Sequence, residues 1–152
     1  MDKQRTLFVC IHNSARSQIA EAYLNLFGGG KFEAESAGLE PGGLNPFAVE
    51  VMKEDGLDIS NNKTKDVFDF FKKGKMYSYV ITVCDEASAE RCPIFPGVCE
   101  RLHWSFADPA AIEETYEEKF SGTRMIRDEI KNKIIDWIRK LENNSLVENG
   151  EK

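Results

Sequence analysis

The chain has 152 residues and a formal net charge of −6, with 41% hydrophobic and 30% charged residues. This length suits one domain with a buried core, and the acidic balance argues against a general nucleic-acid binder and against binding to an anionic membrane surface. No apolar stretch is long enough for a signal peptide or a membrane span. We therefore expect a cytoplasmic protein whose four cysteines are reduced, and are reactive, catalytic or buried rather than structural disulfides.

Strand and helix patterns alternate along the chain. Apolar runs predict strands at residues 7–10, 32–37, 77–83 and 102–104. Helical spacing, together with capping and breaking residues, predicts helices at residues 16–27, 46–55, 85–91 and 123–141, and either a helix or an aromatic turn at residues 67–71. Asp108-Pro109 is a turn signal that opens one more helical segment.

This alternation predicts an α/β fold, with a small four-stranded parallel sheet flanked by helices. We assign residues 1–143 to a single domain and the polar residues 144–152 to a flexible C-terminal tail. Ligands of open parallel sheets bind beyond the carboxyl ends of the strands. Cys10 and Cys84 each follow a predicted strand directly, so both are expected at that edge.

The segment from Cys10 to Ser17 combines a thiol with groups that bind anions. The strand ends at Cys10, and Arg16 and Ser17 open the following helix. A loop that curls into a helix N-terminus directs several backbone N–H groups and the positive end of the helix dipole at one point. The Arg16 guanidinium suits a tetrahedral oxyanion, and a thiol in this field ionises easily. The pattern predicts Cys10 as a nucleophile in an oxyanion cradle.

The residues of this cradle are called the oxyanion loop here: Ile11, His12, Asn13, Ser14, Ala15, Arg16 and Ser17. Ser17 is expected either to donate a hydrogen bond to the Cys10 thiolate or to cap the helix. His12 is given no direct catalytic role, because the cradle uses backbone N–H groups at this position. The alternative interpretation of the whole segment is a buried strand cysteine beside a surface arginine.

Cys84 and Cys92 allow three interpretations. They are a pair of redox thiols, two buried small side chains, or zinc ligands together with Cys99 and His103. The redox interpretation is favoured because Cys92 lies in a polar segment beside Pro93 that does not resemble a core. The spacing also lacks the short Cys-x2-4-Cys pair of structural zinc sites. Cys99 is treated as incidental.

Asp108 precedes Pro109 and has two interpretations. Aspartate is common before proline in turns, where its role is structural. A loop carboxylate can also protonate a leaving oxygen. The sequence alone leaves both roles open.

Residues 10–18, Cys-Ile-His-Asn-Ser-Ala-Arg-Ser-Gln, resemble the signature loop of the low-molecular-weight protein tyrosine phosphatase superfamily. Asn13 matches the asparagine that braces this loop, and Ser17 matches the serine that stabilises the thiolate. Other segments are similar to thioredoxin-coupled arsenate reductases on the same fold, namely residues 35–38, 45–46, 58–60, 83–84, 92–97 and 103–110. The resemblance extends from Leu7 to Leu141 and implies the same phosphatase-like fold.

The resemblance implies a mechanism for the reduction of arsenate to arsenite. Cys10 attacks arsenate held by the oxyanion loop, and Asp108 protonates the departing oxygen. Cys84 then attacks Cys10, which releases arsenite and leaves a disulfide. Cys92 attacks Cys84 and carries the disulfide to the Cys84–Cys92 pair, which thioredoxin reduces.

The resemblance also bears on cofactors and partners. No tightly bound cofactor is expected, but some relatives bind potassium beside the loop. The matching positions are Asn13, Glu21, Ser36 and Asp66. The Cys84–Cys92 spacing is longer than in those relatives, so glutaredoxin or a low-molecular-weight thiol could replace thioredoxin. We expect a monomer that binds neither nucleic acid nor membranes.

Two other functions are considered. Hydrolysis of phosphotyrosine needs only Cys10, Arg16 and Asp108, but Ala110 and Ala111 stand where that family typically has tyrosines that grip the substrate. A non-enzymatic sensor of oxyanions or redox state would bind a partner through the 84–92 segment. Such a sensor would be oxidised stoichiometrically, without recycling.

Overall fold

Four parallel strands form the central sheet of the structure, a computed structural model that describes residues 3–150 and the side chains of residues 3–144. The strands are β1 (Gln4–Cys10), β2 (Phe32–Gly38), β3 (Tyr79–Thr82) and β4 (Glu100–His103). They lie in the order β2-β1-β3-β4, and every neighbouring pair is parallel. The predicted four-stranded parallel sheet is confirmed. The central position of β1 explains why its C-terminal half is an unbroken apolar run.

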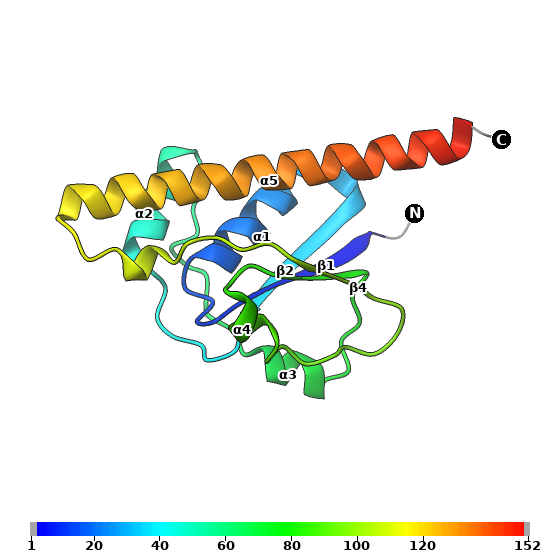
Figure 1. The fold of residues 1–152 in the computed structure, drawn as a ribbon, viewed down its shortest axis with the longest axis horizontal. Coiled ribbons are helices and arrows are strands. Elements are labelled where there is room, and N and C mark those ends of the chain that lie inside the picture. Colours follow the sequence, from blue (N-terminus) through cyan, green and yellow to red (C-terminus); the bar gives the residue numbers. More distant parts are fainter. Residues whose placement is uncertain (1–2, 151–152) are drawn as a thin grey trace.

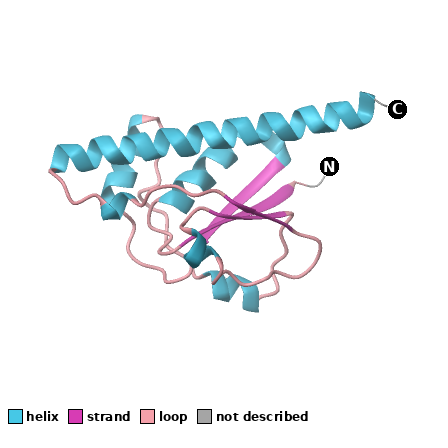
Figure 2. Cartoon of the chain, in the orientation of Figure 1, coloured by secondary structure: helices cyan, strands magenta, loops and turns pink. Residues whose placement is uncertain are grey.

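Helices cover both faces of this sheet (Figures 1 and 2). The helices are α1 (Arg16–Phe27), α2 (Pro46–Glu54), α3 (Val67–Lys72), α4 (Glu86–Ala89) and α5 (Tyr116–Gly150), with short 3-10 turns η1 (Gly29–Lys31) and η2 (Pro109–Ala111). α1 and α5 pack together on one face, and α2 packs against α5. α3 lies on the opposite face, below the sheet in Figure 1.

Two buried clusters result from the alternation of side chains along β1. Phe8 and Cys10 point into the larger cluster, which lies under α1 and α5 and includes Trp137. Leu7 and Val9 point into the smaller cluster, on the α3 side. The sheet therefore separates two cores, and the side of the sheet on which a thiol lies decides which groups it can reach.

The long last helix confirms its predicted apolar stripe. The predicted residues Ile126, Ile130, Ile134, Trp137 and Ile138 are buried, and Leu141 packs against them. Residues 144–150 of the predicted tail continue this helix in the structure, and residues 151–152 lie outside the described residues.

α5 begins before the predicted residue 123. Tyr116 and Phe120 pack on Phe47 of α2, with ring centroids 5.4 and 5.0 Å away. Gly122 lies within this helix and allows close packing, because a Cβ there would lie 2.5 Å from Ile112 Cδ1. Tertiary packing thus extends the helix toward its N-terminus, through a glycine that has low helix propensity.

Other element boundaries differ by a few residues. The strand predicted at 102–104 is β4, which begins at Glu100 and ends before Trp104. Residues 67–72 are a helix rather than a turn, because the Asp66 side chain caps it by accepting from Phe68 N at 2.8 Å. The segment after Asp108 forms only the 3-10 turn η2.

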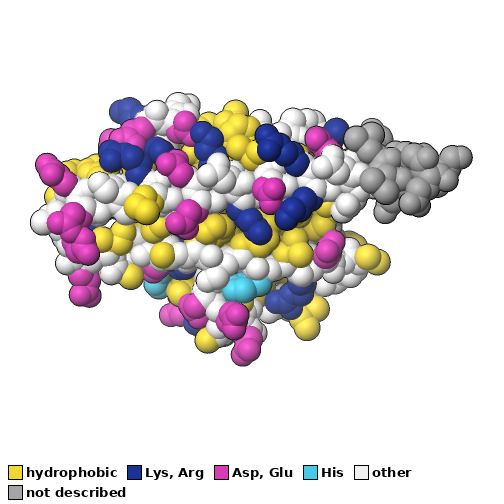
Figure 3. Space-filling model, turned by 45° about the horizontal axis from the view of Figure 1, so that its top comes forward, with side chains coloured by type: hydrophobic (Ala, Val, Ile, Leu, Met, Phe, Trp, Pro, Cys, Tyr) yellow, Lys and Arg dark blue, Asp and Glu magenta, His cyan; other side chains and the backbone are white. Residues whose placement is uncertain are grey.

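The exposed face of α5 carries charges of both signs. Figure 3 shows Lys and Arg side chains interspersed with Asp and Glu along this helix, beside hydrophobic side chains. Within residues 3–150, no helix has both the length and the apolar character needed to cross a membrane.

Candidate active site

The backbone of the oxyanion loop is turned so that its N–H groups face the Cys10 thiol. The carbonyl oxygens of Cys10 and of three loop residues accept hydrogen bonds, at 2.7–3.1 Å, from the N–H groups of Leu39, Glu40, Gly42 and Asn45. In a trans peptide the following N–H points away from the carbonyl, so the loop N–H groups point inward. One of them, Asn13 N, lies 3.1 Å from Cys10 Sγ. The loop can therefore hold an oxyanion against the sulfur.

Asn13 connects this loop to three other segments. Its φ of 54° is left-handed, a conformation that asparagine tolerates better than most residues. Its Nδ2 donates to Ser17 Oγ at 2.7 Å and to Ser36 Oγ at 2.9 Å. Its Oδ1 accepts from Gln18 Nε2 at 3.1 Å and from Lys65 N at 2.9 Å. These bonds use the full capacity of the amide and determine which way it faces.

The direction of the Ser17 hydroxyl follows from this arrangement. Ser17 Oγ accepts a hydrogen bond from Asn13, so its own proton is free to point at Cys10 Sγ, 2.8 Å away. Ser17 and Asn13 are both completely buried, and Cys10 is 2% exposed. A hydroxyl donor in a dry site stabilises a thiolate. Ser17 does not cap α1, whose N-cap residue Ala15 has no side-chain cap.

Arg16 and Asp108 meet at the mouth of the loop. The Arg16 guanidinium is buried and donates to Phe106 O at 3.1 Å. Its second terminal nitrogen lies 3.7 Å from Asp108 Oδ2. The other carboxylate oxygen of Asp108 accepts from Ala110 N at 3.0 Å, so the acid is held in a turn while its side chain stays 34% exposed. Asp108 is thus both a turn residue and a carboxyl group at the site, and the two interpretations do not exclude each other.

Cys84 lies beside Cys10 at the carboxyl edge of the sheet. It follows β3, which is hydrogen-bonded to β1, and the two cysteines belong to the same buried cluster. Burial raises the pKa of the Cys84 thiol to about 11, although the Arg16 guanidinium nearby lowers it. At neutral pH Cys84 is therefore a thiol in this conformation, and it must lose its proton before it can attack.

Cys92 lies on the other side of the sheet. It packs in the smaller cluster with Val80 and Phe95, away from the cluster that holds Cys10. Burial raises the pKa of Cys92 to about 11. The structure therefore brings Cys10 and Cys84 together but leaves Cys92 in a separate core, from which the 85–92 segment would have to move.

The 85–92 segment is held mainly by surface contacts. α4 has no buried residue, and its cap is formed by Asp85, whose side chain accepts from Ser88 N at 2.8 Å. Arg91 forms an ion pair with Glu40 at 2.9 Å, and both side chains are at least half exposed. Exposed ion pairs contribute only about 0 to 1 kcal/mol. Movement of this segment therefore costs mainly the burial of Cys92 and the packing of Ala89 against the larger cluster.

The structure also places His12 and the candidate zinc ligands Cys99 and His103. His12 faces outward, where Nδ1 donates to Glu40 O at 2.8 Å. The described part of the chain contains no cluster of three or more His, Cys, Asp or Glu side chains that could hold a metal ion, and this includes the alternative with Cys99 and His103. His103 Nδ1 instead lies 2.7 Å from Thr82 Oγ1.

Three of the four predicted potassium ligands lie together. Ser36 Oγ accepts a hydrogen bond from the Asn13 amide and donates one to Glu21 Oε1 at 3.0 Å. The same Glu21 oxygen lies 3.5 Å from Lys65 Nζ. The fourth, Asp66, uses its side chain to cap α3.

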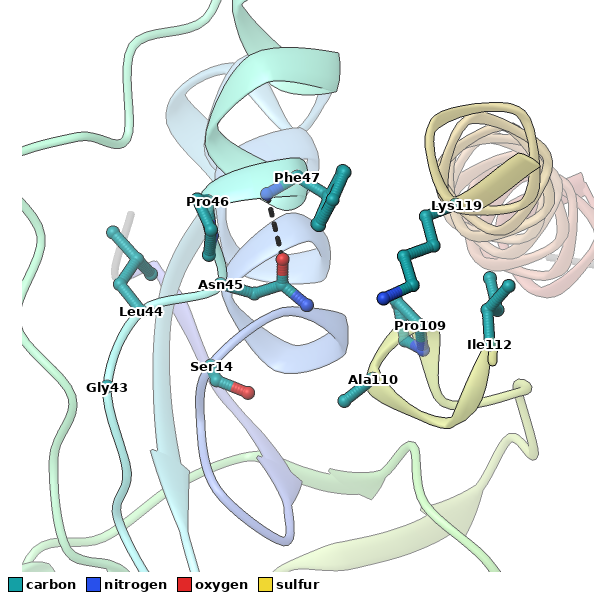
Figure 4. Close-up of a pocket in the computed structure, with 10 residues that line it drawn as sticks. All are labelled: Ser14, Gly43, Leu44, Asn45, Pro46, Phe47, Pro109, Ala110, Ile112 and Lys119. Carbon is teal, nitrogen blue, oxygen red and sulfur yellow. Dashed lines mark hydrogen bonds between the residues drawn. The ribbon is translucent and has the colours of Figure 1, made fainter. Parts of the chain in front are cut away.

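A pocket of about 320 Å³ adjoins the oxyanion loop (Figure 4). It is lined by Ser14, Gly43, Leu44, Asn45, Pro46, Phe47, Pro109, Ala110, Ile112 and Lys119. In Figure 4 Lys119 extends from α5 toward Asn45 and the Pro109 turn. The pocket offers apolar walls and one ammonium group beside the anion site, which is suitable for an organic group attached to an oxyanion.

Gly38 and Lys65 had no predicted role of their own, although both support the loop. Gly38 ends β2 opposite Cys10. Its N–H donates to Lys65 O at 2.8 Å. A Cβ at Gly38 would lie 2.8 Å from both Asn13 N and Ile11 O. A small residue at the end of the strand beside the loop is the signal that could have identified this close approach.

Replacement of Gly38 by alanine should therefore distort the loop. Both clashing atoms are backbone, so relief requires movement of the anion cradle, and we expect kcat/KM to fall about 100-fold and stability to fall by about 1–3 kcal/mol. Steady-state kinetics and thermal denaturation measure these effects. Gly30→Ala is the control, because a Cβ there has no neighbour within 4 Å. Equal kinetics for the two variants would contradict this role of Gly38.

Comparison with known proteins identifies the fold family. Residues 5–147 match the family model for low molecular weight phosphotyrosine protein phosphatases. This protein belongs to that family. Its members include a Bacillus subtilis arsenate reductase that is 42% identical over 137 residues, or 90% of this chain and 96% of that one.

Solved structures agree with this assignment. A thioredoxin-dependent arsenate reductase from Corynebacterium glutamicum superposes with a TM-score of 0.69 at 28% identity, covering 95% of this chain and 64% of that one. A low molecular weight protein tyrosine phosphatase from T. tengcongensis superposes with a TM-score of 0.73, covering 91% and 99%, and at 24% identity it supports the fold alone. The family contains reductases and phosphatases, so the site residues must distinguish the two chemistries.

Proposed function

We propose that this protein reduces arsenate to arsenite, with Cys10 as the nucleophile. The observation that carries the proposal is the second thiol, Cys84, which lies at the end of the neighbouring strand in the same buried cluster as Cys10. A phosphatase needs one thiol only. A reductase must deliver two electrons to arsenic and needs a second thiol that can form a disulfide with the first. The 42% identical relative from B. subtilis is an arsenate reductase, which supports this choice.

The first step forms a bond between sulfur and arsenic. Arsenate binds to the inward N–H groups and to Arg16, and the Cys10 thiolate displaces one oxygen of arsenate. Asp108 is the acid that gives this oxygen a proton, so it leaves as water or hydroxide. Arsenic remains As(V) in the resulting adduct.

The second step is the redox step. Cys84, after losing its proton, attacks Cys10 Sγ, and the electron pair of the S–As bond passes to arsenic. As(III) leaves as arsenite, and two thiols have become the Cys10–Cys84 disulfide. The two electrons gained by arsenic equal the two lost by the sulfur atoms.

The last steps restore the nucleophile. Cys92 attacks Cys84, which frees the Cys10 thiolate and forms the Cys84–Cys92 disulfide. Because Cys92 starts on the other side of the sheet, the 85–92 segment has to unwind, which presents the new disulfide to a reductant. We propose thioredoxin as this reductant, in line with the thioredoxin-dependent relative from C. glutamicum.

A coupled assay tests the function. The protein is mixed with arsenate, thioredoxin, thioredoxin reductase and NADPH, and the absorbance of NADPH is followed. We expect steady consumption that requires both arsenate and thioredoxin. Consumption with glutaredoxin and glutathione instead would reassign the reductant, and none with either donor would contradict catalytic reduction. One turnover per protein molecule would favour the sensor hypothesis.

Hydrolysis of organic phosphates is the second candidate. The pocket beside the loop, between Phe47 and Ile112, has room for an organic group bonded to a bound phosphate (Figure 4). Cys10, Arg16 and Asp108 would suffice for this reaction. Turnover of p-nitrophenyl phosphate measures it independently of Cys84.

A further inference from the structure

A buried chain of hydrogen bonds runs from Lys65 to the nucleophile. Lys65 Nζ lies 3.5 Å from Glu21 Oε1, and Ser36 Oγ donates to that oxygen at 3.0 Å. Asn13 joins Ser36 to Ser17, which lies 2.8 Å from Cys10 Sγ. Ser36, Asn13 and Ser17 have no exposed surface. The Lys65 side chain itself is 31% exposed, but the three links between Glu21 and Cys10 lie where water does not screen their dipoles.

We propose that the Lys65 ammonium is the built-in cation of this site, which neutralises Glu21 and makes the reactivity of Cys10 independent of potassium. This inference rests on the proposed role of Cys10 as the nucleophile. Lys65 is a positioning residue in this scheme, since it acts through Glu21 and does not touch the substrate.

The direction of each hydrogen bond explains why Glu21 needs a cation. Glu21 is an acceptor only while it is ionised, and it then draws the Ser36 proton toward itself. Ser36 Oγ can consequently accept a hydrogen bond from one N–H of the Asn13 amide, and the other N–H of this amide donates to Ser17 Oγ. A protonated Glu21 could donate to Ser36 and reverse this order, whereas an unpaired carboxylate would place a negative charge near the thiolate. The ammonium prevents both outcomes.

At least one side-chain oxygen of each residue expected to bind potassium is already engaged. Asn13 Oδ1 accepts from Gln18 and from the backbone of Lys65. Glu21 Oε1 faces the ammonium, and Asp66 caps α3. A potassium ion would need several of these oxygens at once, so the residues present do not fit a potassium site while Lys65 is in place.

The backbone of Lys65 is held independently of its side chain. Its N–H donates to Asn13 Oδ1 at 2.9 Å, and its carbonyl accepts from Gly38 N at 2.8 Å. Loss of the ammonium alone should therefore leave the loop in place. Lys65→Met keeps the aliphatic chain and removes only the charge and the donors.

The test measures the reactivity of Cys10 without any substrate. Iodoacetamide is added at several pH values in sodium chloride or in potassium chloride of equal concentration. Tryptic cleavage after Arg5 and Arg16 gives a peptide in which Cys10 is the only cysteine, so mass spectrometry follows this thiol alone. This readout works whether the protein is a reductase or a phosphatase, so failure of the proposed function would not be mistaken for failure of this inference.

We expect the wild-type rate to be the same in both salts. Lys65→Met should react about tenfold more slowly at pH 7 in sodium, with its pH profile moved to higher pH, and potassium should restore most of the rate. Lys65→Arg should keep the wild-type behaviour. A wild-type rate that depends on potassium, or an unchanged rate in Lys65→Met, would overturn the inference.

Two further variants separate charge from structure. Lys75→Met is the matched control, because Lys75 pairs with Glu35 of the same strand as Ser36 at 2.7 Å and is 30% exposed, against 31% for Lys65. It should behave as the wild type. In Lys65→Met with Glu21→Gln, no carboxylate remains to neutralise, so the rate should recover in sodium and lose its response to potassium. An equally slow rate in both salts for this double variant would show a structural role only and would overturn the proposal.

Discussion

Replacement of Cys84 by serine should abolish arsenate turnover while hydrolysis of p-nitrophenyl phosphate continues. Serine cannot form a disulfide with Cys10, so the sulfur–arsenic adduct has no route to arsenite, and we expect a loss of about a thousandfold or more in the thioredoxin-coupled assay. The phosphatase reaction uses Cys10, Arg16 and Asp108, which this change leaves in place. Phosphate release should stay within about threefold of the parent rate.

Two controls accompany this experiment. Cys84 has no exposed surface, so the serine variant buries a hydroxyl group, which can lower stability. Cys84→Ala is the first control, because it removes the thiol without burying a hydroxyl group. Cys99→Ser changes a half-buried thiol that the mechanism does not use and should keep full activity. Arsenate turnover at the parent rate in Cys84→Ser would show that the disulfide relay is wrong.

Replacement of Arg16 by lysine should impair both reactions equally. The guanidinium donates to Phe106 O at 3.1 Å and lies 3.7 Å from Asp108, so its plane is fixed over the loop. Lysine retains the charge but presents no planar pair of donors to the oxyanion. We expect kcat/KM to fall about 100- to 1,000-fold for arsenate and for p-nitrophenyl phosphate, the cost of one lost oxyanion donor.

The matched control for this change is Arg124→Lys. Arg124 likewise makes two contacts through its guanidinium, here to the carboxylate of Glu54 at 2.8 and 2.7 Å, but on the surface of α5. Loss of such an exposed pair should change stability little and leave the kinetics unchanged. If Arg16→Lys kept near-normal activity, the charge alone would suffice and the argument from donor geometry would fail.

The features that the sequence predicted well are those encoded locally. β1, the oxyanion loop and the start of α1 lie within one continuous stretch, so an apolar strand followed by Cys10 and Arg16 is enough to recognise them. The apolar stripe on α5 is likewise encoded locally, because apolar residues recur at spacings of three and four within one segment. The parallel sheet followed from the alternation of strands and helices.

The features that escaped prediction depend on contacts between distant segments. Gly38 matters only because β2 lies against the loop, and Lys65 only because its segment pairs with the end of β2 and its side chain meets Glu21. The location of Cys92 across the sheet follows from the packing of the 92–99 segment around Phe95. The early start of α5 comes from an aromatic contact with α2 rather than from helix propensity.

The residues that contact the oxyanion loop are far apart in the sequence, and this matters while the chain is synthesised on the ribosome. Cys10 emerges among the first residues, but the groups that orient its loop arrive much later, with Ser36, the backbone of Lys65 and finally the carbonyl of Phe106. Until then the nascent chain carries an ordinary cysteine. We therefore expect reactivity toward oxyanions only when nearly the whole domain has been made and folded.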